Sequence, residues 1–252
     1  MTPDLPRLLA VALGALVAMA LPAAAADCRR IDHDGQGYVL CEVPADQEPA
    51  LRLFQDGPDG APLRNFANVR RTLGPDETLS FAMNAGMFHA DYRPVGLLVV
   101  DGEERSPIVT GASRDNFGML PNGVFCTGGE RPFQVIESRA FAETRPDCRL
   151  ATQSGPMLVI DGDLHPRFLP DSDSRYIRNG VGVSPDGRTA WFAISSRPVT
   201  FHEFGRLFRD GLGVRDALYF DGSISRLYAP SVRRADFGRS MGPIIGLVEQ
   251  DG

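Results

Sequence analysis

The chain has 252 residues, of which 43% are hydrophobic and 23% charged, so it can build one sizeable core rather than two independent ones. A formal net charge of −6 excludes the broad basic surface that is typical of proteins binding nucleic acid or anionic lipid. All 26 cationic residues are arginine, which excludes lysine chemistry such as Schiff bases and phosphate-loop lysines.

The N-terminal segment has the pattern of a secretory signal. Arg7 precedes an apolar run at Leu8–Leu21, and Ala24–Ala26 fits a small-residue cleavage site. The run is shorter than a membrane-spanning helix requires. We predict a signal peptide at residues 1–26 that is cleaved on export, with an uncleaved anchor as the alternative. The mature domain, residues 27–252, is then periplasmic or secreted, with no stable insertion into the membrane.

Four cysteines lie in the mature chain: Cys28, Cys41, Cys126 and Cys148. An even number in an oxidising compartment indicates disulfides, and the spacings match no zinc-binding motif. We predict the pairs Cys28–Cys41 and Cys126–Cys148, because each closes a short local loop. Free buried thiols are the alternative.

Short apolar runs bounded by Gly, Pro or Asp predict a strand-rich domain. The predicted strands are 38–43, 79–83, 95–100, 133–136, 157–160, 189–194, 217–220 and 244–248. Asn65 is positioned to cap one short helix, and Thr200 with Glu203 forms a capping-box pattern before a second. This order of strands and helices predicts an α+β fold, a single domain built on a mixed β-sheet with a few helices.

Several common catalytic motifs are missing from the sequence, including G-x-S-x-G, G-x-G-x-x-G and the phosphate-binding loop. His202 and Glu203 begin an H-E-x-x-H pattern, but Arg206 replaces the second histidine. We therefore expect no metal site and no cofactor. A divalent cation held by Asp221, Asp171 or Asp173 is the alternative.

The first polar cluster follows the predicted strand 79–83. Asn84 can present its amide to a sugar hydroxyl or a phosphate oxygen, while Gly86 lets the backbone approach closely. A strand-to-turn corner, in which Asn84 bonds its own backbone, is the alternative.

The second cluster is 153–156, before an apolar strand, and the third begins at Arg178 and Asn179. Each cluster places hydrogen-bond donors beside a glycine at an element boundary. The planar guanidinium of Arg178 can bind a phosphate through two parallel hydrogen bonds. A surface arginine paired with Asp171 or Asp173 is the alternative.

The fourth cluster follows the apolar run 217–220, which places Asp221 in a tight turn. Gly222, Ser223 and Ser225 come directly after it and supply two hydroxyl groups. Because Asp-Gly is also the commonest hairpin signal, a simple β-hairpin is the alternative.

Together, these four clusters resemble the phosphodiester glycosidase family, especially its short bacterial branch. MNAGMF with RPVGLLV is similar to the family's N-G-G-x-F segment, and QSGPMLV to S-G-P-x-L. RNGVGVSPDG resembles R-x-x-x-G-x-x-x-D-G, and ALYFDGSIS resembles L-D-G-G-x-S. The resemblance runs from about Ser80 to Tyr228. It departs from the family pattern at Ala85, Ser223 and Ile224, where the family has glycines.

The resemblance implies hydrolysis of a sugar 1-phosphodiester at the bond between the anomeric carbon and the phosphate. It implies Asp221, Arg178 and Asn84 as the catalytic residues. The implied substrate-binding residues are Gly86, Ser154, Gly155, Asn179, Gly222, Ser223 and Ser225. Glu137, Asp101 and Asp91 are alternative second carboxylates. A non-catalytic envelope protein that binds a phosphorylated glycan through the same groups is the alternative function.

Overall fold

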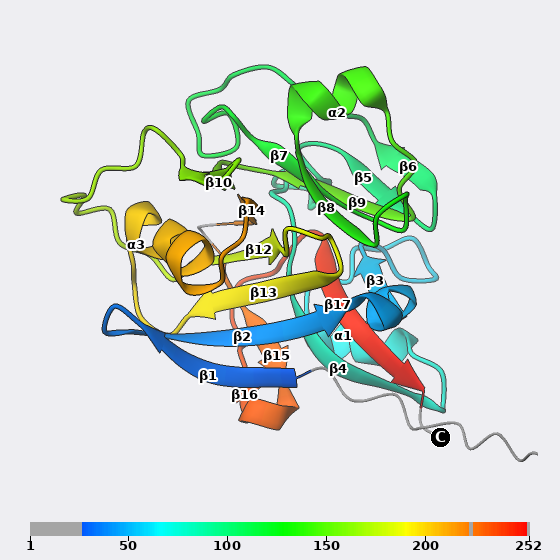
Figure 1. Ribbon diagram of the computed structural model, residues 1–252. Helices are drawn as coiled ribbons and strands as arrows, with labels where there is room; N and C mark the ends of the chain where they lie inside the picture. The colour runs from blue at the N-terminus through cyan, green and yellow to red at the C-terminus, as the bar shows by residue number, and fades with distance from the viewer. Residues whose placement is uncertain (1–26, 222–223, 251–252) are drawn as a thin grey trace, which may run out of the picture.

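Strands form three sheets in the computed structural model, which describes residues 27–221 and 224–250 (Figure 1). The predicted signal peptide and the Gly222–Ser223 pair lie outside the described residues. The first sheet has seven strands, in the spatial order β1 (Asp27–His33), β2 (Gln36–Pro44), β13 (Thr189–Ser195), β12 (Asn179–Val183), β14 (Asp216–Tyr219), β10 (Met157–Ile160) and β11 (Asp163–Leu164).

The other two sheets have five strands each. We call the first the β4 sheet; its order is β16 (Arg234–Ala235), β15 (Leu227–Ala229), β4 (Glu77–Asn84), β17 (Ile244–Gln250) and β3 (Leu51–Phe54). The second is the β9 sheet, with the order β6 (Glu103–Ser106), β5 (Leu98–Val100), β9 (Leu150–Ser154), β7 (Gly123–Thr127) and β8 (Phe133–Glu137).

The helices are short and lie on the outer faces of the sheets (Figure 1). They are α1 (Phe66–Thr72), α2 (Ser138–Thr144) and α3 (Phe201–Arg206), which continues into a π-helical turn at Leu207–Gly211, and there are 3-10 turns at Ala45–Ala50 and Pro230–Val232. Among the described residues, no helix is long and apolar enough to span a membrane.

Both predicted helix starts are confirmed. The Asn65 side chain accepts a hydrogen bond from the backbone N–H of Asn68 at 2.8 Å. Thr200 and Glu203 form a complete capping box: the Thr200 hydroxyl accepts from the Glu203 N–H, and the Glu203 carboxylate accepts from the Thr200 N–H. These bonds satisfy backbone donors that would otherwise have no partner in the first turn.

The predicted fold built on β-sheet with a few helices is confirmed, but the prediction that the sheet is mixed is wrong. Every strand pairing in residues 27–221 and 224–250 is antiparallel, and strands greatly outnumber helices, so the domain is mostly β. The segment β13–α3–β14 does cross over a helix, which is the pattern that suggested parallel pairing. However, β12 is inserted between β13 and β14 and pairs antiparallel with both.

One hydrophobic core joins the three sheets. Phe192 of β13, Phe81 of β4 and Phe125 of β7 are at most 1% exposed, and each comes from a different sheet. The Phe192 ring centroid lies 5.3 Å from that of Phe81 and 5.6 Å from that of Phe125. Such aromatic contacts add to the large apolar area that each ring buries. This phenylalanine triad therefore holds the sheets together at their common centre.

Both predicted disulfides are present. Cys28 on β1 is bonded to Cys41, the residue directly opposite it on β2. Cys126 on β7 is bonded to Cys148, just before the neighbouring strand β9. No cysteine among the described residues is free.

Candidate functional site

Two asparagines from different sheets form the centre of the candidate site. Asn84 is the last residue of β4 and Asn179 the first of β12, and neither is more than 1% exposed. The Asn84 Nδ2 donates to the Asn179 Oδ1 at 3.1 Å, and the Asn179 Nδ2 donates to the Asn84 carbonyl at 2.9 Å. The alternative in which Asn84 bonds its own backbone is therefore wrong, and the first and third sequence clusters meet here.

The fourth cluster reaches Asn84 through Arg226. The backbone N–H of Arg226 donates to the Asn84 Oδ1 at 2.8 Å. The neighbouring Ser225 donates its hydroxyl to the Asp221 carbonyl at 2.7 Å. The two hydrogen bonds, together with the peptide link between Ser225 and Arg226, connect Asp221 to the asparagine pair. Asp221 itself is nearly buried, with 8% of its surface exposed.

The second cluster contacts the same segment. Ser154, the last residue of β9, donates its hydroxyl to the Phe220 carbonyl, which directly precedes Asp221. The Phe220 N–H in turn donates to the Asn179 carbonyl at 3.1 Å. All four sequence clusters therefore converge on one place, although they lie far apart in the chain. Ends of strands from all three sheets supply them.

The hairpin alternative for Asp221 is wrong. β14 ends at Tyr219 and belongs to the seven-stranded sheet, whereas β15 begins at Leu227 and pairs with β4 in the β4 sheet. The segment 220–226 therefore passes from one sheet to another. The described residues of this crossing are the ones that carry the hydrogen bonds to Ser154, Asn179 and Asn84.

Arg178 is buried, with 1% of its surface exposed. Its Nε donates to the Val199 carbonyl at 2.9 Å, its Nη2 to the Ser174 carbonyl at 3.0 Å and its Nη1 to the Tyr219 hydroxyl at 3.3 Å. It forms no ion pair with another described residue, so the alternative of pairing with Asp171 or Asp173 is wrong. Burial lowers the pKa of the Arg178 guanidinium, and the Tyr219 interaction opposes this shift.

A stack of planar groups fixes the Arg178 guanidinium. The guanidinium lies 3.6 Å from the ring centroid of Phe201, a cation–π contact. On its other side Phe201 stacks on Phe168 at 4.9 Å, and Phe168 stacks on His165 at 4.9 Å. No local pattern predicts this stack, because its members come from separate segments and Phe168 and Phe201 look like ordinary apolar residues.

Tyr219 connects Arg178 to Asp221. In the antiparallel register Gly180 lies opposite Tyr219, and extending this register two residues beyond that pair, past the strand ends, places Arg178 opposite Asp221. Burial raises the pKa of the Tyr219 hydroxyl far above its usual value, the Arg178 charge opposes the shift, and the Asp221 carboxylate adds to it. The Tyr219 hydroxyl is therefore neutral, accepts a hydrogen bond from Arg178 and is influenced by the charge of Asp221. Strand alternation from Asp221 is the signal that could have identified it.

The predicted glycines are packed against protein atoms. A Cβ atom at Gly86 would lie 2.3 Å from the Gln153 carbonyl oxygen. The Gly86 N–H donates to the Thr152 hydroxyl at 3.2 Å. A Cβ at Gly155 would lie 2.6 Å from the Asn122 Cβ. Both glycines thus allow close contact between the strand ends that carry Asn84 and Ser154.

The three alternative second carboxylates bind other groups. Glu137 accepts hydrogen bonds from the first backbone N–H groups of α2, at 2.9 and 3.0 Å. Asp91 pairs with Arg93 at 2.7 Å, and Asp101 pairs with Arg149 at 3.7 Å. None of these bonds involves the Asn84–Asp221 region. Within the described ranges no group of three His, Cys, Asp or Glu residues could hold a metal ion.

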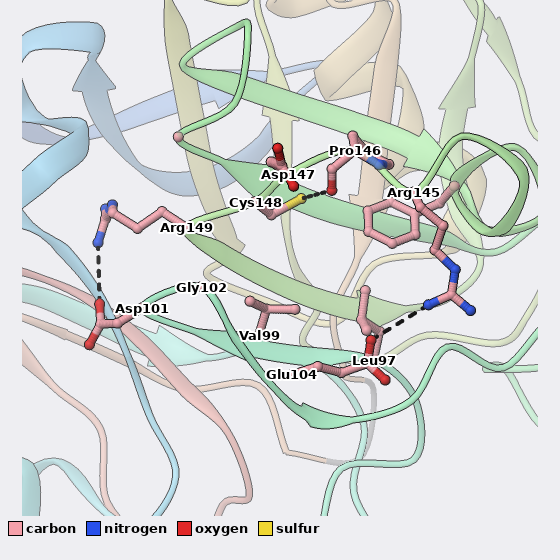
Figure 2. A pocket seen from close by; sticks show the side chains of 12 residues that line it. Leu97, Val99, Asp101, Gly102, Glu104, Arg145, Pro146, Asp147, Cys148 and Arg149 are labelled. Carbon is pink, nitrogen blue, oxygen red and sulfur yellow. Dashed lines mark hydrogen bonds and ion pairs between the residues drawn. The ribbon is translucent and has the colours of Figure 1, made fainter.

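Two surface cavities lie away from this cluster. One, of about 530 Å³, is lined by residues of β5, β6, α2 and the segment 145–149, and it contains the ion pairs Arg149–Asp101 and Arg145–Glu104 (Figure 2). The other, of about 960 Å³, lies between the 55–63 loop and the 89–95 hairpin. Neither is lined by Asn84, Asn179 or Asp221, so cavity size does not locate the candidate site.

The fold and the cluster define a β-rich domain with a polar site where three sheets end together. The sequence profile of the phosphodiester glycosidase family matches residues 77–247. The uncharacterized protein YigE of Escherichia coli (strain K12) is 35% identical over 182 residues, which cover 72% of this chain and 70% of YigE. The chain belongs to the phosphodiester glycosidase family.

Solved structures show the same fold at low sequence identity. The catalytic domain of zebrafish N-acetylglucosamine-1-phosphodiester alpha-N-acetylglucosaminidase, auto-inhibited by its pro-peptide, matches with a TM-score of 0.61 and 14% identity, over 88% of this chain and 81% of that one. A hypothetical protein from Synechocystis matches with a TM-score of 0.54 and 13% identity, over 88% and 61% of the two chains.

Proposed function

We propose that the chain is an exported hydrolase that cleaves a sugar 1-phosphodiester between the anomeric carbon and the phosphate. Family membership supports this class of reaction. The observation that carries it is the convergence of the four family motifs around the Asn84–Asn179 pair and the residues next to Asp221. Two disulfides favour an oxidising compartment, as an exported protein requires.

Asp221 is the carboxylate that we assign to the chemistry. Cleavage of a glycosidic bond passes through an oxocarbenium-like transition state, which a nearby carboxylate attacks or stabilises. Water adds to the anomeric carbon, and the products are a free sugar and a phosphomonoester. Since the departing phosphate is already a weak base, the reaction has little need of a second carboxyl group as a general acid.

Arg178 supports this step through its charge. Its guanidinium donates hydrogen bonds to Val199, Ser174 and Tyr219, and it lies on the same face of the sheet as Asp221. A fixed cation in a buried site stabilises negative charge that develops nearby more strongly than one in water. We assign substrate orientation to Asn84 and Asn179 together with the hydroxyl groups of the cluster.

The test is hydrolysis of N-acetylglucosamine 1-(methyl phosphate), the kind of diester named for the zebrafish enzyme. The mature chain should release free sugar and methyl phosphate, both of which are measured by NMR. The Asp221→Asn variant supplies the matched control, because it keeps the size of the side chain and removes its charge. Equal release by the parent and the variant would contradict the assignment of Asp221.

The second candidate function is a non-catalytic module that binds a phosphorylated glycan. The replacement of a family glycine by Ala85 favours it, because this position differs from the family pattern. Calorimetry with the same diester separates the two functions. Binding without release of methyl phosphate during a long incubation at excess protein would support the module and contradict the hydrolase.

A further inference from the structure

Arg226 is a largely buried residue whose guanidinium has no partner within residues 27–221 and 224–250. The residue is only 8% exposed. Its guanidinium nevertheless forms no hydrogen bond, ion pair or ring contact with any described residue. Its one hydrogen bond in the described chain is from the backbone N–H to Asn84. The other well-buried arginine, Arg178, has three acceptors and an aromatic ring.

Arg226 lies inside the candidate site. Leu227 pairs with Met83 in the antiparallel register, which places Arg226 opposite Asn84. Side chains directly opposite each other on antiparallel strands leave from the same face, with Cβ atoms about 5 Å apart. The residue before Arg226 is Ser225, whose hydroxyl donates a hydrogen bond to the Asp221 carbonyl. Arg226 therefore lies beside the asparagine pair, and its neighbour Ser225 links it to the backbone of the proposed catalytic residue.

The surroundings of the guanidinium leave its charge uncompensated. A Cβ atom at Gly238 would lie 2.9 Å from the Arg226 Nη2, so the loop at 236–240 covers this group. The Asp236 carboxylate already binds Arg234 at 2.9 Å and the Leu227 N–H at 2.9 Å. Burial lowers the pKa of Arg226, and the Asp236 charge only partly opposes this shift. A cation that is largely removed from water is stabilised when an anion pairs with it.

We propose that Arg226 binds the phosphate group of the substrate diester and of the phosphomonoester product. The inference rests on the proposed function, and it assigns the anion-binding role to a residue outside the four family motifs. A guanidinium binds two phosphate oxygens through parallel hydrogen bonds. The single charge of Arg226 matches the single negative charge of a phosphodiester.

The test titrates methyl phosphate into the mature chain by calorimetry. Arg226→Gln should raise the Kd for methyl phosphate by about ten- to hundredfold, since a hydrogen bond to a charged group is lost. Arg226→Lys keeps the charge and should recover part of the affinity. Arg239→Gln is the matched control, because it removes the same charge from an exposed position of the covering loop. It should bind methyl phosphate as the parent does.

Two results would overturn the inference: a parent-like Kd in Arg226→Gln, or no binding of methyl phosphate by the parent at millimolar concentration. If Arg226→Gln does not fold, the Arg226 Nε–H resonance of the parent is followed by NMR during the titration. A resonance that does not move would overturn the inference as well.

The outcomes separate this inference from the proposed function. Hydrolysis of the diester with an unchanged Kd in Arg226→Gln contradicts the phosphate site and leaves the hydrolase standing. Binding of methyl phosphate that depends on Arg226, without hydrolysis by the parent, supports the phosphate site and contradicts the hydrolase. Acetate serves as a third probe: binding of acetate in place of methyl phosphate would overturn the choice of phosphate.

Discussion

Asn84 donates a side-chain hydrogen bond to Asn179 at 3.1 Å and receives one on its carbonyl at 2.9 Å, although the two residues are 95 positions apart. This pair joins the β4 sheet to the seven-stranded sheet beside the candidate carboxylate. Since both side chains are buried, their amides stabilise the fold as well as the site.

Asn84→Ala should therefore lower the free energy of unfolding as well as activity. The change leaves the Asn179 Oδ1 and the Arg226 N–H without a partner, and each unsatisfied buried group costs about 1–3 kcal/mol. Urea unfolding of the mature chain measures the loss. A variant as stable as the parent would show that water or neighbouring groups replace both bonds.

Asp221→Asn should keep the fold and lose turnover by at least ~10², the usual effect of removing an acid or base from a catalytic site. Steady-state kinetics and a melting curve are measured together. Asp173→Asn is the control, because Asp173 lies on an exposed loop. Since Asp173 is also one of the alternative ligands for a divalent cation, the same variant tests that alternative. Near-parental turnover in Asp221→Asn would mean that the catalytic carboxylate lies elsewhere.

Arg178→Lys should lower both turnover and stability. An ammonium keeps the charge but cannot reach three acceptors and the Phe201 face in one geometry. We expect a loss of about 2–4 kcal/mol in the free energy of unfolding, from two or more broken charge-assisted bonds. Arg175→Lys, an exposed arginine paired with Glu203, should leave turnover unchanged. An unchanged Tm in Arg178→Lys would contradict the structural part of this prediction.

Glu77 gives the domain a defined sensitivity to acid. Hydrogen bonds from Arg52, and then from the Gly74 N–H, lower the pKa of the Glu77 carboxyl from 4.5 to about 2. A depressed folded-state pKa stabilises the protein above the unfolded value and loses that effect as the pH falls. The free energy of unfolding should thus decrease more steeply between about pH 4.5 and about pH 2 in the parent than in Glu77→Gln.

The control for this pH dependence is Glu143→Gln, which changes an exposed carboxylate on α2. Its stability should follow the parent curve. Parallel curves for the parent and Glu77→Gln would contradict the role of the Arg52–Glu77 pair.

The sequence predicted the elements whose signals are local. The apolar run 157–160 is β10, and the capping box at Thr200 begins α3, because hydrophobic runs and caps depend on neighbouring residues. β9 was missed because its sequence LATQS alternates poorly, and it is a strand only through its pairing with β7 and β5. α2 was missed because its N-cap is Glu137, an unusual capping residue.

The site was predictable as a set of motifs but not as a geometry. Asn84, Asn179, Ser154 and Asp221 were all named from the sequence, and the structure brings them together. The burial of Arg178 depends on ring contacts between distant segments, which no local pattern shows. Arg226 lies outside the family motifs, and only its burial without a side-chain partner in the described part of the chain distinguishes it from the many exposed arginines.

The phenylalanine triad has a consequence for how the protein loses its function. Since Phe81, Phe125 and Phe192 each belong to a different sheet, and Phe192 contacts both other rings, no sheet can separate without breaking at least one ring contact of Phe192. Backbone amides in the central strands should then exchange with solvent only through one global opening, with a common free energy. The strand ends that form the candidate site belong to the same three sheets, so heat inactivation and global unfolding should coincide in a single cooperative transition.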